Sequence, residues 1–565
     1  MTKARQDRAK VPLRSPEIVM RLERLGSFHQ CRLSFMRSLL RRMKSEHWTF
    51  SRRCFDIDPK GVGRAIYSMQ GPSHAYSLIC FAHDLPSELR SDRVIAEAWD
   101  ATFTLFDGVP SATDIDRLSH NVPKQEAGRI TDKEICLSRA NRSVRLFDYV
   151  VESLANGQQP DQSKVNDVGY LMRTTAVYGS GKFGAADREV LADRPEFKSP
   201  FQAEMLSVFL IRAFSLDLVE HLAKARSPKT AVSLKPGLRR MFGIGNSTGL
   251  GMAPFIVNHP ILLNNWIKAR ELALSKLRSK TSASKSEQLT FKEMLARAQK
   301  NATEWRSQHL LQIAKLNDLK TDLDRLEAHV EAGALNQNSP WDHLYLWAED
   351  ALSLEGQEQL VSLMLEAYGD LVDPLTSGMD ADEGEAFVID GGMKLRELRS
   401  IVEDVYGWAL DIDWSSRANI ARVWYVSEEK LEPRLGERFE EPIEPFEQPL
   451  APGRDAALMY RDLKRCDQKM SVADFLHQHP EHRHSARRAQ IAARYPYAEI
   501  RDNTVSASLM PIDLLRLKLS FFGATHFDPR SDRWVRINMF RQAPFPHELT
   551  DSDADDWSYP ALAPG

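Results

Sequence analysis

The stretch from Gly243 to Pro254 constrains the fold of this chain more than any other. It reads Gly-Ile-Gly-Asn-Ser-Thr-Gly-Leu-Gly-Met-Ala-Pro, with four glycines and a proline in twelve residues. Glycine adds no side-chain packing and loses much backbone entropy on folding, so such a cluster marks a tight turn or a close approach to another group. That group is either a ligand or another part of the protein, and both interpretations stay open at this point.

A second glycine-bearing stretch runs from Arg173 to Gly184. Both stretches adjoin predicted helices, whose N-termini present backbone N–H groups that can bind an anion. Both also carry hydrogen-bond donors: Arg173, Thr174, Tyr178 and Lys182 in one, and Asn246, Ser247, Thr248 and the backbone of Gly249 in the other. The pattern predicts a carboxylate or phosphate held between the two stretches. Tight turns and close helix contacts are the competing interpretation.

Gly245 to Gly249 matches Gly-x-Ser-x-Gly, the nucleophile elbow, which makes Ser247 a candidate nucleophile. The elbow needs a strand that ends at the serine and a helix that begins there. Residues 236–242 are a weak strand candidate, and the alternating strand and helix pattern of a hydrolase sheet is missing.

The same glycines resemble, only locally, the dinucleotide-binding turn of short-chain dehydrogenases. That turn belongs near the start of its fold, whereas a long sequence precedes Gly245 here. The sequence Gly179-Ser-Gly-Lys182 suggests a P-loop but lacks its first glycine and the Ser or Thr after the lysine. A P-loop is therefore rejected.

The C-terminal stretch 521–534 mixes apolar residues with Thr525, His526, Asp528, Arg530 and Arg533. Because histidine titrates near neutral pH, His526 is a candidate general acid or base that Asp528 could orient. A structural salt-bridge network is the alternative. His259, just after the first glycine stretch, is a second candidate for proton transfer.

Four histidines lie close together between His477 and His484. Zinc-binding helices usually carry two histidines at i and i+4, whereas Pro480 interrupts a helix here. Arg483, Arg487 and Arg488 also disfavour a cation. The segment is interpreted as a solvated loop or a helix start, and no metal ligands are predicted. The sequence leaves the cofactor undetermined.

Composition narrows the function classes. The 565 residues carry a formal net charge of -3 and a pI near 6.6, which argues against nucleic acid or an anionic membrane as a partner. Five scattered cysteines form no Cys-x-x-Cys pair and are interpreted as reduced thiols. No secretory h-region precedes the chain's first predicted helix, and no apolar run is long enough to cross a bilayer. We expect a cytoplasmic protein.

The hydrophobic patterns predict an α+β protein that is predominantly α-helical, with a small antiparallel N-terminal sheet and a large helical central region. The four expected strands are 48–57, 64–69, 75–83 and 94–106. Polar, helix-leaning sequence follows them, and further helices are expected at 142–154, 201–225, 310–326, 393–410 and 485–494. Strands are expected at 386–389, 422–427 and 534–540. The predicted domains are 1–190, 191–427, a linker at 428–453, and 454–565.

The two ends of the chain differ in charge. Arg32, Arg37 and Arg41 belong to a basic N-terminal region, whereas the tail from Leu549 is acidic and is expected to be mobile. The basic region is interpreted as a solvated face or as an interface with acidic segments elsewhere.

The leading functional hypothesis is a cytoplasmic metabolic enzyme that binds a small anionic substrate between the two glycine stretches. Arg173, Lys182 and the backbone from Asn246 to Gly249 would hold the anion, and His526 or His259 would move a proton. One alternative is a non-catalytic helical interaction protein, with a homo-oligomer as one form. A dinucleotide-dependent oxidoreductase is another.

Overall fold

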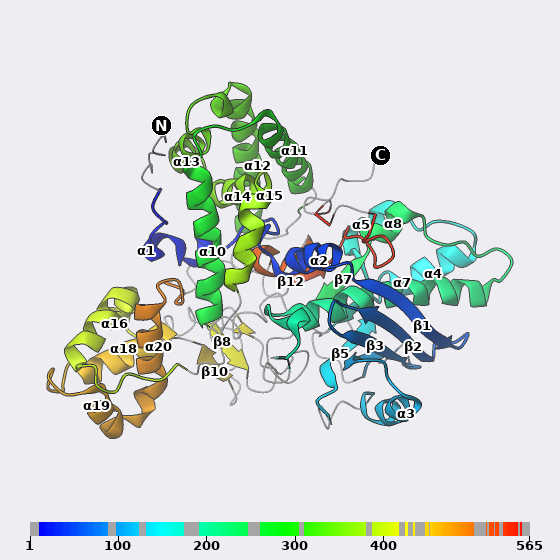
Figure 1. Cartoon of the computed structure of the whole chain (residues 1–565), viewed down its shortest axis with the longest axis horizontal. Coiled ribbons are helices and arrows are strands. Elements are labelled where there is room, and N and C mark those ends of the chain that lie inside the picture. Colours follow the sequence, from blue (N-terminus) through cyan, green and yellow to red (C-terminus); the bar gives the residue numbers. More distant parts are fainter. Residues whose placement is uncertain are drawn as a thin grey trace, which may run out of the picture. The chain divides into compact units, whose positions relative to one another are not determined.

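The computed structural model describes the chain between residues 11 and 557 (Figure 1). Within this range the description leaves out residues 87, 89–97, 124–130, 175–190, 192, 247–259, 304, 306–309, 380–386, 417–423, 428–432, 435–446, 451, 502–515, 517–518, 525, 530–534, 552–553 and 556. None of the described helices is both long and apolar enough to cross a membrane.

The chain forms two compact units, each assembled from separate segments. Unit 1 comprises Met1–Phe28, Ala253–Ala302 and His309–Leu517, and unit 2 comprises His29–Met252, Thr303–Gln308 and Lys518–Gly565. The four-part division along the chain stays a prediction.

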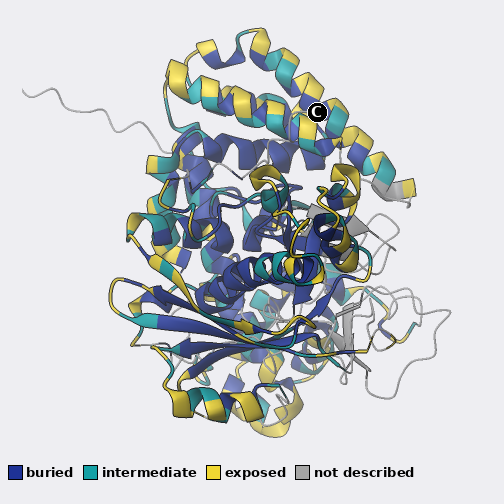
Figure 2. Cartoon of the chain, turned by 90° about the vertical axis from the view of Figure 1, so that its right-hand side faces the viewer, coloured by how far each residue is buried: buried dark blue, intermediate teal, exposed yellow. Residues whose placement is uncertain are grey.

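Unit 2 is built on one mixed sheet in the order β1-β2-β3-β4-β5-β6-β7-β12-β11. Its strands are β1 (Thr49–Ile57), β2 (Gly63–Gln70), β3 (Ala75–Ala82), β4 (Ala101–Asp107), β5 (Glu134–Arg142), β6 (Tyr170–Thr174), β7 (Gly243–Asn246), β11 (His526–Pro529) and β12 (Val535–Met539). All neighbouring strands are antiparallel except β6 and β7, which are parallel. Strands β2 to β5 are mainly buried, whereas β1 at the edge of the sheet is largely exposed (Figure 2).

The sequence prediction for this sheet is correct in part. The antiparallel meander β1 to β4 and the strand β12 are confirmed. The expectation of a small, N-terminal sheet is wrong, because β5, β6, β7, β12 and β11 extend it with strands from distant parts of the chain. β5 lies in sequence that was expected to be helix-leaning, and its residues are almost all buried.

Helix α7 (Gln202–Arg226) covers one face of the sheet and connects the parallel strands β6 and β7. The ring of Phe214 packs edge-on against Phe103 of β4, and Asp217 accepts a hydrogen bond from the Tyr67 hydroxyl of β2. The helix was expected to be amphipathic, yet most of its residues are buried because α2 and α4 cover it on other sides. The other helices of unit 2 are α2 (Phe35–Ser45), α3 (Ala112–Asn121), α4 (Phe147–Ala155), α5 (Gln162–Val168), η3 (Pro195–Phe197) and α8 (Pro236–Met241).

Unit 1 is mainly helical. Its larger elements are α10 (Pro260–Arg278), α11 (Lys285–Ala302), α12 (Leu310–Glu331), α13 (Pro340–Ala351), α14 (Leu354–Glu366), α16 (Leu395–Leu410), α18 (Pro452–Leu463), α19 (Val472–Gln478) and α20 (Arg483–Arg494). Shorter ones are α1 (Pro16–Val19), η1 (Leu22–Arg24), η4 (Ala334–Asn336), α15 (Gly369–Val372), η5 (Asp373–Met379), η6 (Pro480–His482), and the strands β8 (Trp424–Ser427), β9 (Pro433–Arg434) and β10 (Glu447–Leu450).

The predicted helices of unit 1 are largely confirmed. Leu316, Leu319, Leu323 and Leu326 of α12 are all buried, as their spacing of three and four predicts. The strand predicted at 422–427 corresponds to β8, whereas residues 387–389 form no strand. The segment predicted as a linker contains β9 and β10.

A buried ion network ties the N-terminal segment of unit 1 to its helices. Arg14 donates to Glu271 of α10 at 2.8 Å and to Glu358 of α14 at 2.8 Å. Burial acts to raise the pKa of Glu358, but the guanidinium groups of Arg14 and Arg270 outweigh it and lower that pKa below its ordinary value. The network therefore holds these segments with charges that are compensated inside the core.

The basic N-terminal region of unit 2 contacts the acidic C-terminal tail. Arg32, Arg37 and Arg41 all lie within 3.3 Å of the Asp555 carboxylate. Trp557 is buried as well, and its backbone carbonyl accepts a hydrogen bond from Gln30. The described part of the tail is thus packed rather than mobile, because three guanidinium groups and a buried indole hold it.

Candidate functional site

The parallel pair β6 and β7 brings the ends of two distant strands together. Arg173 of β6 is in register with Gly245 of β7, and the crossover through α7 makes both strands run the same way. The carboxyl ends of parallel strands meet at one edge of a sheet, and ligands of open α/β sheets bind outside that edge. The stretch from Arg173 begins in β6 and the stretch from Gly243 begins in β7, so both continue from this edge.

A row of residues crosses the sheet at this level. In sheet order it contains His83, Asp100, Asn141, Arg173, Gly245, Asn538 and His526. The backbone N–H of His83 donates to the carbonyl of Asp100 at 2.9 Å, and the backbone N–H of Asp100 donates to Oδ1 of Asn141 at 2.8 Å. The remaining neighbours in the row are register partners. The sheet therefore aligns seven residues whose positions in the sequence span most of the chain.

The centre of the row carries the polar residues that the sequence singled out. Arg173, Thr174 and Asn246 are buried, with exposed fractions of 4%, 2% and 1%. The Thr174 hydroxyl donates to the carbonyl of Arg139 at 3.0 Å, and the Asn246 amide donates to the carbonyl of Thr174 at 3.5 Å. All three residues lie at the carboxyl ends of β6 and β7, with Thr174 and Asn246 on one face of the sheet and Arg173 on the other, because consecutive strand residues point to opposite faces.

Asp100, directly before β4, and Asn141 of β5 are further buried polar residues at this level of the sheet. The Asp100 carboxylate accepts the backbone N–H of Arg142 at 2.9 Å. The Asn141 amide also donates to the carbonyl of Ala98 at 3.1 Å. Buried polar groups are stable only when they are hydrogen-bonded, and these two side chains meet that requirement through the backbone.

Two of the glycines are explained by packing within the protein. A Cβ atom on Gly243 would lie 2.6 Å from the carbonyl oxygen of Met539 in β12, and one on Gly245 would lie 2.8 Å from the ring of Tyr170 in β6. Both glycines let neighbouring groups approach the backbone closely. For this part of the stretch, the close neighbour is therefore the protein and not a ligand.

Several predicted site residues lie outside the described residues. These are Tyr178, Lys182, Ser247, Thr248, Gly249 and His259. For Ser247 one requirement of the nucleophile elbow is met, since β7 ends at Asn246, directly before the serine. The helix that an elbow needs would begin in residues that are likewise outside the description.

His526 lies in β11, two strands from β7. It pairs with Asn538, which itself pairs with Gly245. Neighbouring strands are about 4.8 Å apart, so the backbones of His526 and Arg173 are separated by roughly 15 Å across three such steps. That distance is short enough for loops at this edge to contact both residues.

His83 is a polar residue of the row that sequence reasoning missed. It follows β3, is half-buried, and its Nε2 lies 3.0 Å from the Thr102 hydroxyl. Burial lowers the pKa of His83, while the nearby Asp100 acts to raise it, and the net shift is downward. The imidazole is therefore neutral at neutral pH and able to accept a proton.

Asn538 was missed as well. It is buried in β12, and its amide donates to the carbonyl of Val168 at 3.2 Å. A single Asn or His inside an apolar strand carries no sequence signal of its own. The register of the sheet is what places these residues in the same row as Arg173.

Metal-ligating side chains gather elsewhere. Among the described residues, the group that could hold a metal ion is Asp462, His479, Glu481 and His482 of unit 1. The row in unit 2 instead holds the guanidinium of Arg173 and the amides of Asn141 and Asn538, which can bind an anion, together with the carboxylate of Asp100, which the backbone N–H of Arg142 binds.

Comparison with protein-family models, with curated proteins and with solved structures found no match to this chain.

Proposed function

We propose that unit 2 binds a small carboxylate- or phosphate-bearing metabolite at the carboxyl ends of β6 and β7 and acts on it by proton transfer, as a cytoplasmic enzyme. The observation that carries the proposal is the parallel register of Arg173 with Gly245. It makes two sequences rich in glycine and in donors continue from one edge of the sheet, at strand ends where Arg173, Thr174 and Asn246 are buried.

The chemistry of these groups favours an anion. A guanidinium group forms short, charge-assisted hydrogen bonds to carboxylate and phosphate oxygens. Asn246 and Thr174 add neutral polar groups, and Lys182 and Thr248 are the further donors proposed from the sequence. Burial at the strand ends strengthens such interactions because little water competes for them.

Proton transfer is assigned to His526, with His259 and Ser247 as the further catalytic candidates from the sequence. The position of β11 in the same sheet supports the choice of His526. His83, on the opposite side of Arg173, is an additional candidate because its imidazole is neutral and half-buried. A general base with this character suits proton abstraction near neutral pH.

Ligand-induced thermal stabilisation of the full chain tests the proposal. Inorganic phosphate, sulfate, succinate and a set of phosphorylated metabolites would be added to the wild type, to Arg173→Met, to Asn246→Ala and to Lys182→Ala. A ligand at 100 times its Kd stabilises the folded state by about 2.7 kcal/mol. We expect at least one anion to raise the Tm of the wild type and the three variants to lose this response.

Lys224→Met is the matched control. Lys224 is an exposed cation near the end of α7, away from the strand ends, so its removal changes net charge without touching the proposed site. This variant should respond like the wild type. If no anion stabilises the wild type, or if Lys224→Met loses the response as fully as Arg173→Met, the proposal fails and a non-catalytic interaction protein becomes the better account.

A further inference from the structure

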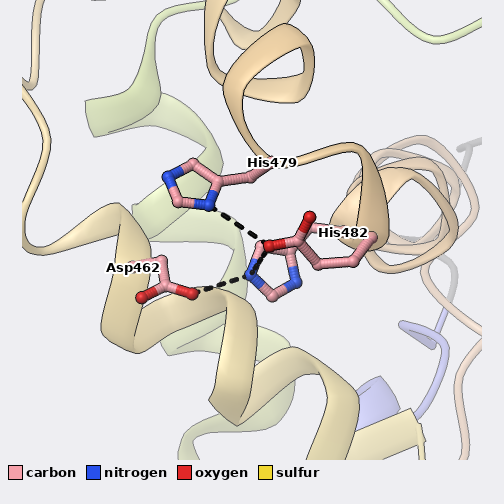
Figure 3. A group of neighbouring side chains, drawn as sticks. Asp462, His479 and His482 are labelled. Atoms are coloured by element: carbon pink, nitrogen blue, oxygen red, sulfur yellow. Dashed lines mark hydrogen bonds and ion pairs between the residues drawn. The ribbon is translucent and has the colours of Figure 1, made fainter.

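A cluster of four side chains in unit 1 has the composition of a metal site. Asp462 comes from α18, whereas His479, Glu481 and His482 come from the turn between α19 and α20. Figure 3 shows the Asp462 carboxylate directed at the imidazole of His482, with the imidazole of His479 close to both. One ligand atom from each of the four residues lies within 4.8 Å of all the others.

The local sequence explains this turn. Pro480 ends α19 at Gln478, as the sequence analysis predicted, and a single 3-10 turn leads into α20. That turn places His479, Glu481 and His482 on one side of the junction. The interruption by Pro480, which argues against the usual helical zinc motif, therefore produces a compact set of ligands of another kind.

The scaffold beneath the cluster is a well-packed helical core. Phe475 of α19 is fully buried together with Leu463 of α18 and residues of α16 and α20. The Phe475 ring lies 5.9 Å from the imidazole of His482, and the two planes differ by only 4°. The centroid of the His479 ring lies 4.9 Å from that of Phe475. One buried aromatic ring therefore holds both histidines in position.

The distances between ligand atoms are close to those of a tetrahedral zinc site. His482 Nε2 lies 2.9 Å from Asp462 Oδ2, His479 Nδ1 lies 3.3 Å from Glu481 Oε1, and His482 Nε2 lies 4.0 Å from Glu481 Oε1. Zinc bonds of 2.0–2.1 Å in a tetrahedron separate neighbouring ligands by about 3.4 Å. These three pairs differ from that spacing by about 0.1 to 0.6 Å, and because all four ligand atoms lie within 4.8 Å of one another, no pair has to close by more than about 1.4 Å.

The charges around the cluster also fit a cation. Aspartate and glutamate side chains are ionised at neutral pH, so Asp462 and Glu481 offer a cation two negative charges. Arg488 is engaged with Glu499 at 2.6 Å, and Arg487 donates to the carbonyl of Phe387. These two arginines are thus directed to other partners.

Arg465 is the cation that touches the cluster, at 3.1 Å from Oδ1 of Asp462. Its side chain is 79% exposed, and Oδ1 is the oxygen that does not face His482. The second oxygen, Oδ2, is the one directed at the other three residues. Arg465 therefore leaves the proposed ligand atom of Asp462 in place.

We propose that Asp462, His479, Glu481 and His482 bind a divalent transition metal, with zinc as the best match. Two imidazoles and two carboxylates suit zinc, whereas calcium takes six to eight oxygen ligands and magnesium an octahedral set. The ion clamps the end of α18 to the turn between α19 and α20. Its role is structural, because four protein ligands fill a tetrahedral shell.

The test measures zinc binding by the full chain, without a histidine tag, in competition with a chromophoric chelator. We expect one zinc ion per chain and no comparable binding of magnesium or calcium. His482→Ala and His479→Ala should each weaken zinc binding by more than about 100-fold, since loss of an outer-shell partner alone costs about 10- to 100-fold. Far-UV circular dichroism confirms that each variant folds.

His477→Ala and His484→Ala are matched controls, because both histidines are exposed in the same segment and lie outside the cluster. Both variants should bind zinc like the wild type. Absence of stoichiometric binding, or equal losses in control and cluster variants, overturns the proposal. If His482→Ala does not fold, Glu481→Gln takes its place in the zinc-binding test. The Glu481 side chain is 60% exposed, so its replacement leaves the core intact.

Discussion

Strands β1 to β4 follow one another along the chain, whereas β6, β7, β12 and β11 come from three distant parts of it. The first set, the meander half, is joined mainly by short turns and buries apolar residues together with the hydroxyl residues Ser68, Ser77, Thr102 and Thr104. The second set, the mixed half, includes a parallel pair and buries Arg173, Asn246 and Asn538. Strand β5 joins the two halves of one sheet.

This difference distinguishes residues that stabilise the fold from buried polar residues whose presence stability alone does not explain. Buried polar groups in strands cost stability unless they are fully hydrogen-bonded, and apolar residues would pack there more simply. This sheet concentrates buried guanidinium and amide groups at the ends of its parallel strands. Departures from the usual preference for apolar residues in a core are expected mainly at functional sites. The meander half is therefore interpreted as scaffold and the mixed half as the region that binds.

The largest effect is expected from Leu78→Ala in the meander half. Leu78 of β3 is fully buried, and removal of a buried leucine side chain destabilises a protein by about 2–5 kcal/mol. Chemical denaturation should show this loss for unit 2. Anions that raise the Tm of the wild type should still raise the Tm of this variant. If they do not, the division of the sheet into a scaffold half and a binding half is wrong.

Gly243→Ala should destabilise the mixed half. The new Cβ would meet backbone atoms in and just after β12, the carbonyl oxygen of Met539 at 2.6 Å and the nitrogen of Arg541 at 3.0 Å, which cannot rotate away. Overpacking of this kind costs about 1–3 kcal/mol, and we expect the upper end. A variant as stable as the wild type in urea would show that β7 and β12 are not in close contact.

Glu196→Gln probes a polar contact of the meander half. The carboxylate accepts the backbone N–H groups of Ser73 and His74 and the hydroxyl of Tyr76, which fixes the turn between β2 and β3. Glutamine keeps one acceptor oxygen, so we expect the free energy of unfolding at neutral pH to fall by an amount at the lower end of about 1–3 kcal/mol. Urea denaturation of the two proteins measures it.

The same substitution predicts a pH dependence. Burial acts to raise the pKa of Glu196, but the hydrogen bonds, led by that from Ser73, lower it below its ordinary value. A lowered pKa stabilises the fold above the unfolded pKa, about 4.3, and this contribution is lost as pH falls through the folded pKa. Above about pH 5 the free energy of unfolding of the wild type should exceed that of Glu196→Gln by a constant amount. Below about pH 4 this difference should shrink. A gap that widens in acid would contradict this assignment.

Gly237→Ala should have the smallest effect and the opposite sign. A Cβ at this position in α8 would meet no atom within 4 Å. Alanine is favoured over glycine in helices by about 0.5–1 kcal/mol, so the variant should be slightly more stable than the wild type. Denaturation curves of Gly237→Ala and Gly243→Ala, recorded together, separate the effect of an added methyl group from that of a close strand contact.

The sequence predicts the meander half well because its strands are rich in aromatic and β-branched residues, are separated by turn residues and pair with their neighbours in the chain. It misses β5 because that strand lies in polar, helix-leaning sequence, and β6 because it is short and pairs with the distant β7. Arg173 and Asn246 were found through the glycines beside them. His83, Asp100 and Asn141 were missed because only the register aligns them.

The cluster of Asp462 with three residues of the α19–α20 turn illustrates the same limit. The histidine-rich segment is visible in the sequence, but its fourth member comes from α18. Only the packing of α18 against α20 brings the carboxylate to the turn. Spacing rules for helical zinc motifs do not describe a set of ligands divided in this way.

Hydrogen–deuterium exchange, followed by mass spectrometry of the full chain, tests the central claim most directly. It would be measured with and without saturating inorganic phosphate, or succinate if that anion gives the larger thermal shift. The account predicts slower exchange in peptides covering 170–190 and 243–259 together, and no change in peptides of β1 to β3. Protection of only one of the two stretches, or of neither, would contradict a single anion site at the ends of β6 and β7.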